Sequence, residues 1–117
     1  MIRPQLLPDP GPKYVLRFFH DDSAPDMAKF DADCTAHWSD PESMWIHGLL
    51  VRNGSLTRKW LLELLELAEK GGARWIKYKR ADGIPLPGGI VQPNGDIWVP
   101  VATMRARFPF DTNFAAL

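Results

Sequence analysis

Residues 43 to 80 constrain the fold more than any other part of the chain, because their hydrophobic pattern changes type twice. Ser43 to Val51, SMWIHGLLV, is almost continuously apolar, which is typical of a strand buried on both faces. Leu56 to Lys70, LTRKWLLELLELAEK, carries leucines at helical spacing and is followed by two glycines that favour a helix end. Ala73 to Arg80, ARWIKYKR, returns to a strand pattern. We therefore expect a βαβ unit over residues 44 to 80, with its two strands parallel.

The flanking segments predict further strands and one more helix. Lys13 to His20 is rich in β-branched and aromatic residues, which predicts a strand. Ser23 is suited to cap a helix from Pro25 to about Ala36, with the proline in its first turn. Farther along, two β-type runs flank Pro-Asn-Gly-Asp at 93–96, which predicts a hairpin. The fold class expected is α/β with a mixed sheet, in which the central βαβ unit is followed by a C-terminal β-hairpin.

Proline marks the N-terminal end of the chain. Prolines stand at positions 4, 8, 10 and 12, so residues 1 to 12 are expected to form an irregular Pro-rich arm. Residues 13 to 101 are expected to be a single α/β domain, and residues 102 to 117, where the signals are weak, a C-terminal arm. Such arms have little to pack against by themselves, so we expect them to contact a partner protein.

The charge balance argues against two classes of partner. The chain has 14 basic and 14 acidic residues and a formal net charge of zero, which gives no global attraction to nucleic acid or to an anionic membrane. The basic residues Lys77, Lys79 and Arg80 are too few to predict nucleic-acid binding. No stretch approaches the roughly 20 apolar residues that span a bilayer. The single cysteine, Cys34, cannot form an internal disulfide, which indicates a reducing compartment and a cytoplasmic location.

The strand–helix–strand run resembles the central motif of the GNAT fold, that of the GCN5-related N-acetyltransferases. The matching segments are His47-Gly48-Leu49-Leu50-Val51, then Leu61-Leu62 through Leu67-Ala68, then Gly72-Ala73-Arg74-Trp75-Ile76. In that family the loop before the helix carries two glycines and a further helix follows the second strand. Here residues 52 to 58 contain one glycine, and a Pro/Gly loop follows instead. The resemblance is therefore to a reduced member of the family, of a compact kind that occurs in phages and prophages.

The resemblance implies an acyl-CoA-dependent N-acyltransferase, with acetyl-CoA as its cofactor. The 44–51 strand would guide the pantetheine arm through backbone hydrogen bonds. The start of the following helix would hold the pyrophosphate, because its backbone N–H groups and its dipole attract anions. The cofactor-binding residues implied are Leu50, Val51, Arg52, Asn53, Gly54, Ser55 and Arg58. His47 would be the base that deprotonates the acceptor amine, and Tyr78 a general acid.

Two other groups of residues carry chemistry in principle. Cys34 and His37 lie three apart on the helix expected there and could act as nucleophile and base. His20, Asp21 and Asp22 could join them as metal ligands. No family signature surrounds the cysteine and no paired ligand motif is present, so a buried thiol, packed histidines and turn aspartates explain these residues more simply. We predict no metal site.

A non-catalytic function is the alternative to an acyltransferase. The missing second glycine and the Pro-rich ends favour a structural protein of a virion or an inhibitor that binds a host protein. The strand–loop–helix frame favours the enzyme. Trp98, on the predicted hairpin, is the best candidate for contact with such a partner, because tryptophan is enriched at interface hot spots.

Overall fold

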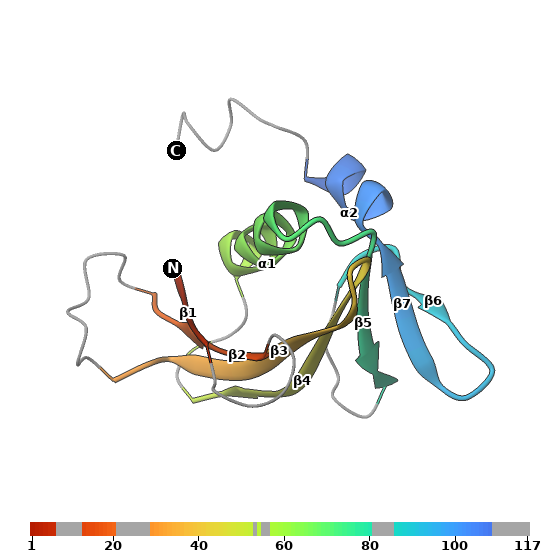
Figure 1. The fold of residues 1–117 in the computed structure, drawn as a ribbon. Coiled ribbons are helices and arrows are strands. Elements are labelled where there is room, and N and C mark those ends of the chain that lie inside the picture. Colours follow the sequence, from red (N-terminus) through yellow and green to blue (C-terminus); the bar gives the residue numbers. More distant parts are fainter. Residues whose placement is uncertain (7–12, 21–28, 53, 55–56, 81–85, 109–117) are drawn as a thin grey trace.

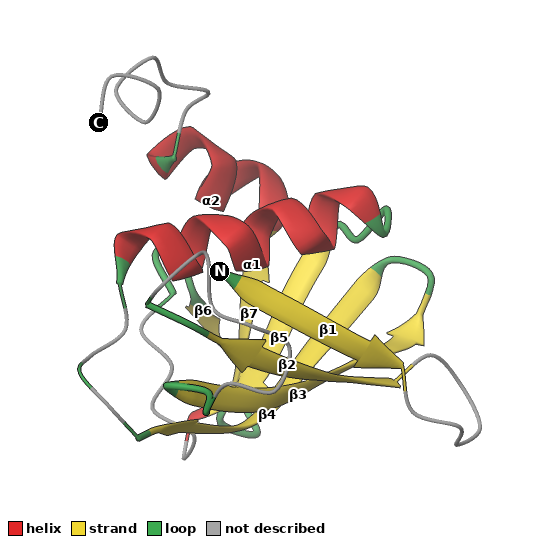
Figure 2. Ribbon diagram, turned by 90° about the vertical axis from the view of Figure 1, so that its left-hand side faces the viewer, coloured by secondary structure: helices red, strands yellow, loops and turns green. Residues whose placement is uncertain are grey.

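The computed structural model describes residues 1–6, 13–20, 29–52, 54, 57–80 and 86–108. These residues form one sheet of seven strands, in the order β1-β2-β3-β4-β5-β7-β6. The strands are β1 (Ile2–Leu6), β2 (Lys13–Phe18), β3 (Ala32–Asp40), β4 (Ser43–Val51), β5 (Trp75–Lys79), β6 (Ile90–Val91) and β7 (Asp96–Pro100). Two helices, α1 (Arg58–Lys70) and α2 (Val101–Arg107), lie on the same face of the sheet (Figures 1 and 2).

The sheet is mixed and mostly antiparallel. β1 to β4 pair antiparallel in chain order, β4 and β5 pair parallel across α1, and β7 pairs antiparallel with both β5 and β6. The predicted mixed sheet, the βαβ unit and the C-terminal hairpin are therefore confirmed. Gly95, with φ of 90°, donates its N–H to the oxygen of Gln92 at 2.9 Å and closes the hairpin turn.

The core lies between the sheet and α1. Alternate residues of β2, β3, β4 and β5 point toward the helix and are enclosed there, as the period of two in a strand requires. From α1 the enclosed residues are Trp60, Leu64, Leu65 and Ala68. Trp60 is 1% exposed, and its indole N–H donates to the backbone oxygen of Phe19 at 3.1 Å. A buried tryptophan thus ties α1 to the end of β2.

The helix begins slightly later than its sequence pattern predicts. Thr57 is the N-cap, and its hydroxyl accepts the N–H of Trp60 at 3.1 Å. Gly72, with φ of 78°, follows the helix end, as two glycines in succession predict.

The expected helix from residue 25 to 36 is wrong over residues 32–36, which belong to β3; residues 21–28 lie outside the described part of the chain. Ala32, Cys34 and Ala36 are buried and alternate with half-buried residues along β3. β3 is paired on one side with β2 and on the other with β4. Cross-strand pairing on both edges overrides the weak local preference for a helix.

Parts of the two segments expected to be arms form regular secondary structure. Residues 2–6 form β1, an edge strand in which Pro4 is tolerated because one side of the strand has no partner in the sheet. Residues 101–107 form α2, whose Val101 and Met104 join the core. Residues 7–12 and 109–117 lie outside the described structure.

Candidate functional site

β4 and β5 separate beyond Ile46 and Tyr78, and this fork is the centre of the candidate site. Their parallel pairing runs from Ser43 with Trp75 to Ile46 with Tyr78, whereas β4 continues to Val51 (Figure 1). The edge of residues 47–51 that faces β5 has no partner among the described strands. The fork therefore offers an open strand edge.

A bulge in β4 lies at the same place. The register with β3 shifts by one residue, so that Gly48 and Leu49 together oppose Cys34. Gly48 has φ of 63°, a left-handed conformation that glycine adopts without strain. A bulge bends the strand that carries it, which here lies where β4 leaves β5.

The loop after β4 is packed against the start of α1. The N–H of Arg52 donates to the oxygen of Asp31 at 2.7 Å, and its guanidinium lies 4.9 Å from the ring centre of Phe30. Gly54 lies so close to His20 that a Cβ atom there would be 2.6 Å from the imidazole Nε2. His20 in turn stacks on Trp60, with 4.4 Å between ring centres. The described part of this loop is thus fixed by ring contacts on both sides.

The two arginines of the predicted phosphate site point to different neighbours. Arg58 lies over the ring of Phe108 at 4.6 Å and donates to the backbone oxygen of Arg107, toward α2. Arg52 lies over Phe30 instead. Of the other predicted cofactor residues, Leu50 is 52% exposed and Val51 packs against the core, while Asn53 and Ser55 are outside the described residues. The two arginines thus lie apart, Arg58 directed toward α2 and Arg52 toward the residues that precede β3.

His47 and Tyr78, the predicted base and acid, lie on opposite faces of the sheet. Tyr78 is 3% exposed on the helix-covered face, and its pKa is raised by burial, against a smaller lowering by a backbone hydrogen bond with Leu86. His47 lies on the other face, where its ring stacks on those of His37 and Trp45 at 4.9 and 5.8 Å. The two residues flank the fork from either side, and their side chains do not meet.

Cys34 and His37 do not form a catalytic pair. Three residues apart on a strand, they point to opposite faces. Burial, and to a smaller extent the neighbouring charge of Asp33, raises the pKa of the Cys34 thiol to about 12, so it stays protonated at neutral pH. Within the described residues no group of three or more His, Cys, Asp or Glu side chains could hold a metal ion. Asp21 and Asp22 are outside those residues.

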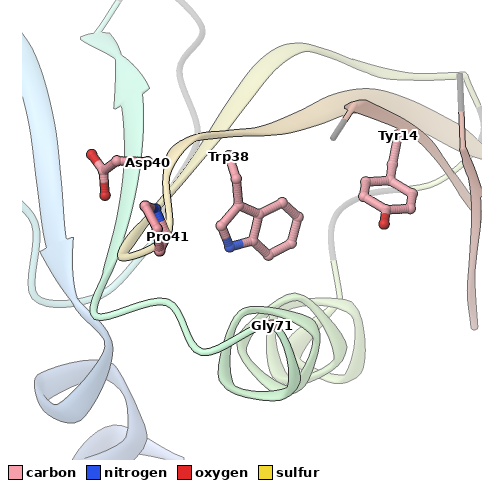
Figure 3. Close-up of a pocket in the computed structure, with 5 residues that line it drawn as sticks. All are labelled: Tyr14, Trp38, Asp40, Pro41 and Gly71. Atoms are coloured by element: carbon pink, nitrogen blue, oxygen red, sulfur yellow. The ribbon is translucent and has the colours of Figure 1, made fainter. Parts of the chain in front are cut away.

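A cavity of about 420 Å³ lies at the other end of α1, between the helix and β2–β3 (Figure 3). It is lined by Tyr14, Trp38, Asp40, Pro41 and Gly71. The rings of Tyr14 and Trp38 meet edge to face with 5.9 Å between their centres. Among the described residues of this lining, the ionisable groups are the Asp40 carboxyl and the Tyr14 hydroxyl, and the rest of the lining is mostly apolar.

Sequence reasoning missed a row of aromatic and basic side chains on the face opposite the helices. Lys13, His37, Trp45, Lys77 and Trp98 are successive register partners from β2 to β7. Alternation within each strand predicts which residues share a face, but only the strand order and register show that these five stand in line.

In the described part of the chain, neither helix is long and apolar enough to span a membrane. Comparisons with protein-family models, with curated protein sequences and with solved structures gave no match.

Proposed function

We propose that the chain binds an acyl-CoA in the fork between β4 and β5, as a reduced protein of the GNAT type. The observation that carries the proposal is the edge of β4 beyond Ile46, which has no partner among the described strands and is followed, after residues 52 to 57, by the start of a 13-residue helix. An exposed strand edge can pair with an extended amide chain such as the pantetheine arm. A helix N-terminus attracts phosphate through its dipole and its N–H groups.

In this proposal the backbone of Leu50 and Val51 pairs with the pantetheine, and Arg52, which is exposed, contacts the pyrophosphate. A ligand in the fork lies in the plane of the sheet and is reached from both faces. His47 accepts a proton from the acceptor amine, whose nitrogen attacks the thioester carbonyl. The carbon–sulfur bond then breaks, and Tyr78, kept protonated by its raised pKa, donates a proton to the departing thiolate.

The test is the thermal midpoint of the purified chain with and without acetyl-CoA. A ligand at 100 times its dissociation constant stabilises by about 2.7 kcal/mol, which corresponds to a rise of roughly 10 °C for a domain of this size. Arg52→Glu removes the phosphate contact and reverses its charge, so the rise should fall by more than half. ADP and pantetheine, measured separately, should each give a smaller rise.

Lys70→Glu is the matched control, because Lys70 is an exposed residue in the last turn of α1 and far along the helix from the fork. Its rise with acetyl-CoA should equal that of the unchanged chain. The absence of a rise at millimolar acetyl-CoA would contradict the proposal. The alternative, a non-catalytic virion or inhibitor protein that uses this fold as a scaffold, would then be preferred.

A further inference from the structure

The sheet face that points away from α1 and α2 is covered by no described helix (Figure 1). We refer to it as the open face. Its central row runs through register partners on six strands, and consists of Lys13, His37, Trp45, Lys77, Trp98 and Ile90. An uncovered sheet face of a protein this small is ordinarily polar, with isolated apolar residues. A row of aromatic rings and lysines on this face is therefore unusual.

The rings and the cations of the row are in contact. The ammonium of Lys77 lies 3.9 Å from the ring centre of Trp98 and 5.9 Å from that of Trp45. The ring of Trp45 is parallel to that of His47 within 6°, and His47 is parallel to His37 within 7°. Ser39 accepts the indole N–H of Trp45 at 3.1 Å, which fixes the orientation of that ring. The row is a continuous aromatic surface with a lysine at its centre.

A second cluster of the same composition lies at the edge of the open face. Phe30 is flanked by two guanidinium groups, that of Arg17 at 5.7 Å and that of Arg52 at 4.9 Å from the ring centre. Together with Lys29 and Asp31, Phe30 and Arg52 line a cavity of about 500 Å³. The arrangement again presents positive charge beside an aromatic ring.

Basic side chains outnumber acidic ones on this face. Lys13 and Lys77 make no ion pair with any described residue, and Arg17 and Arg52 add to them. The acidic residues near them are Asp33 on β3, which is the register partner of Arg17, and Asp96 on β7, which is the register partner of Lys79. The pKa of Asp40, the last residue of β3, is lowered chiefly by a hydrogen bond from the backbone N–H of Glu42, and the charge of Lys77 contributes to the lowering. The basic residues come from three separate parts of the chain, β2, the loop after β4, and β5, so the sequence does not show them as a cluster.

We propose that the open face binds single-stranded nucleic acid. Such a ligand alternates flat bases with phosphates, and proteins bind it by stacking bases on aromatic side chains beside a basic groove. Lys13 and Lys77 are three strand spacings apart, about 14 Å, on a sheet of the size that stacks about two or three bases. An acidic peptide would pair with the lysines but would leave the half-buried rings without a stacking partner. The open face shares His47 and Arg52 with the proposed acyl-CoA fork, but Lys13, Lys77 and Trp98 have no role in that fork, so this proposal does not depend on it.

The test is the fluorescence anisotropy of a labelled single-stranded oligothymidine 12-mer, titrated with the full chain over a series of salt concentrations. Contact with three or four phosphates predicts a slope of log K against log salt of about −2 to −3. Lys77→Glu should weaken binding at least about tenfold, and Trp98→Leu should weaken it by a similar factor through lost stacking. Lys70→Glu, the same charge change on α1, should leave binding unchanged, and the thermal midpoint of each variant shows whether it is folded.

Three results would overturn the proposal. The first is no binding of the oligonucleotide at low salt. The second is binding of heparin, a polyanion without bases, as tightly as the oligonucleotide, together with no effect of Trp98→Leu; this would show attraction by charge alone. The third is preference for a poly-glutamate peptide over the oligonucleotide, which would assign the face to an acidic protein. If Trp98→Leu does not fold, the proposal is still tested by the losses of binding in Lys13→Glu and Lys77→Glu and by the comparison with heparin.

Discussion

Gly54 combines two constraints at the start of the candidate site. Its φ of 75° is in the left-handed region, and a Cβ atom at this position would lie 2.6 Å from the Nε2 atom of His20. The His20 ring is held by stacking on the buried Trp60, and the backbone N–H of His20 donates to the carboxylate of Asp31 at 2.7 Å. Gly72 has a similar φ of 78° with no atom within 4 Å of its ideal Cβ. Substitutions at Gly54 and Gly72 can therefore distinguish the cost of a positive φ from the cost of steric overlap with His20.

We expect Gly54→Ala to lower the free energy of unfolding by about 2–3 kcal/mol, and Gly72→Ala by about 1 kcal/mol, since only the first adds overlap to the cost of a positive φ. Urea unfolding followed by tryptophan fluorescence measures both. Equal losses for the two variants would mean that His20 moves away without cost, and that the loop is less fixed than its contacts indicate.

At the scale of elements, an ion pair joins α1 to α2. Arg105 of α2 binds Glu69 of α1 with two hydrogen bonds, one of them from Nε to Oε2 at 2.9 Å, and also donates to the oxygen of Phe108 at 2.8 Å. The hydrogen bond from Arg105 is the largest cause of a lowered pKa of the Glu69 carboxyl. Glu69 and Arg105 thus add an ion pair to the contacts that hold the short helix, which are the buried Val101, Met104 and Phe108 and the hydrogen bond from Arg58 to the backbone oxygen of Arg107.

This pair makes stability depend on acid pH. The pKa of Glu69 in the folded chain is lower than its ordinary value of 4.5. The ion pair therefore contributes its full stabilisation above pH 4.5, and this stabilisation is lost as the pH falls through the folded-state pKa. Arg105→Ala should lower the free energy of unfolding at pH 7 by about 1 kcal/mol, since both side chains are partly exposed to solvent.

Unfolding experiments at pH 7 and at pH 3 check this expectation. The difference in stability between the original chain and Arg105→Ala should shrink at pH 3. Arg107→Ala, an exposed arginine of the same turn, is the control and should change stability little at either pH. A difference that is the same at both pH values would show that Arg105 acts through packing and not through the carboxylate.

At the scale of the whole molecule, β1 makes the N-terminal residues part of the sheet. Its residues pair with β2 from Ile2 with Phe18 to Leu6 with Tyr14. Ile2 packs against the core, next to the buried Phe18. The edge of β2 would otherwise be exposed along its length.

Deleting residues 1–6 should therefore lower the free energy of unfolding by at least about 2 kcal/mol, from lost ladder hydrogen bonds and lost apolar contact. The midpoint of urea unfolding and the amide exchange rates of β2 measure the effect. An unchanged midpoint would support the irregular arm that the prolines predict. The substitution Gln5→Ala, at an exposed position of β1, is the control for a local change that keeps the strand.

The sequence alone determined the elements whose signals are local. The leucine spacing of α1, the glycines after it, the apolar run of β4 and the Pro-Asn-Gly turn each depend on residues within a few positions of one another, and the βαβ unit and the hairpin follow from them. The tertiary structure alone decided that residues 32–36 form a strand and that residues 2–6 join the sheet, since their partners are distant in sequence. It also decided that His47 and Tyr78 face opposite ways and that Lys13, Trp45 and Lys77 stand in one row. Register and strand order depend on which strands meet in space, and no local pattern contains that information.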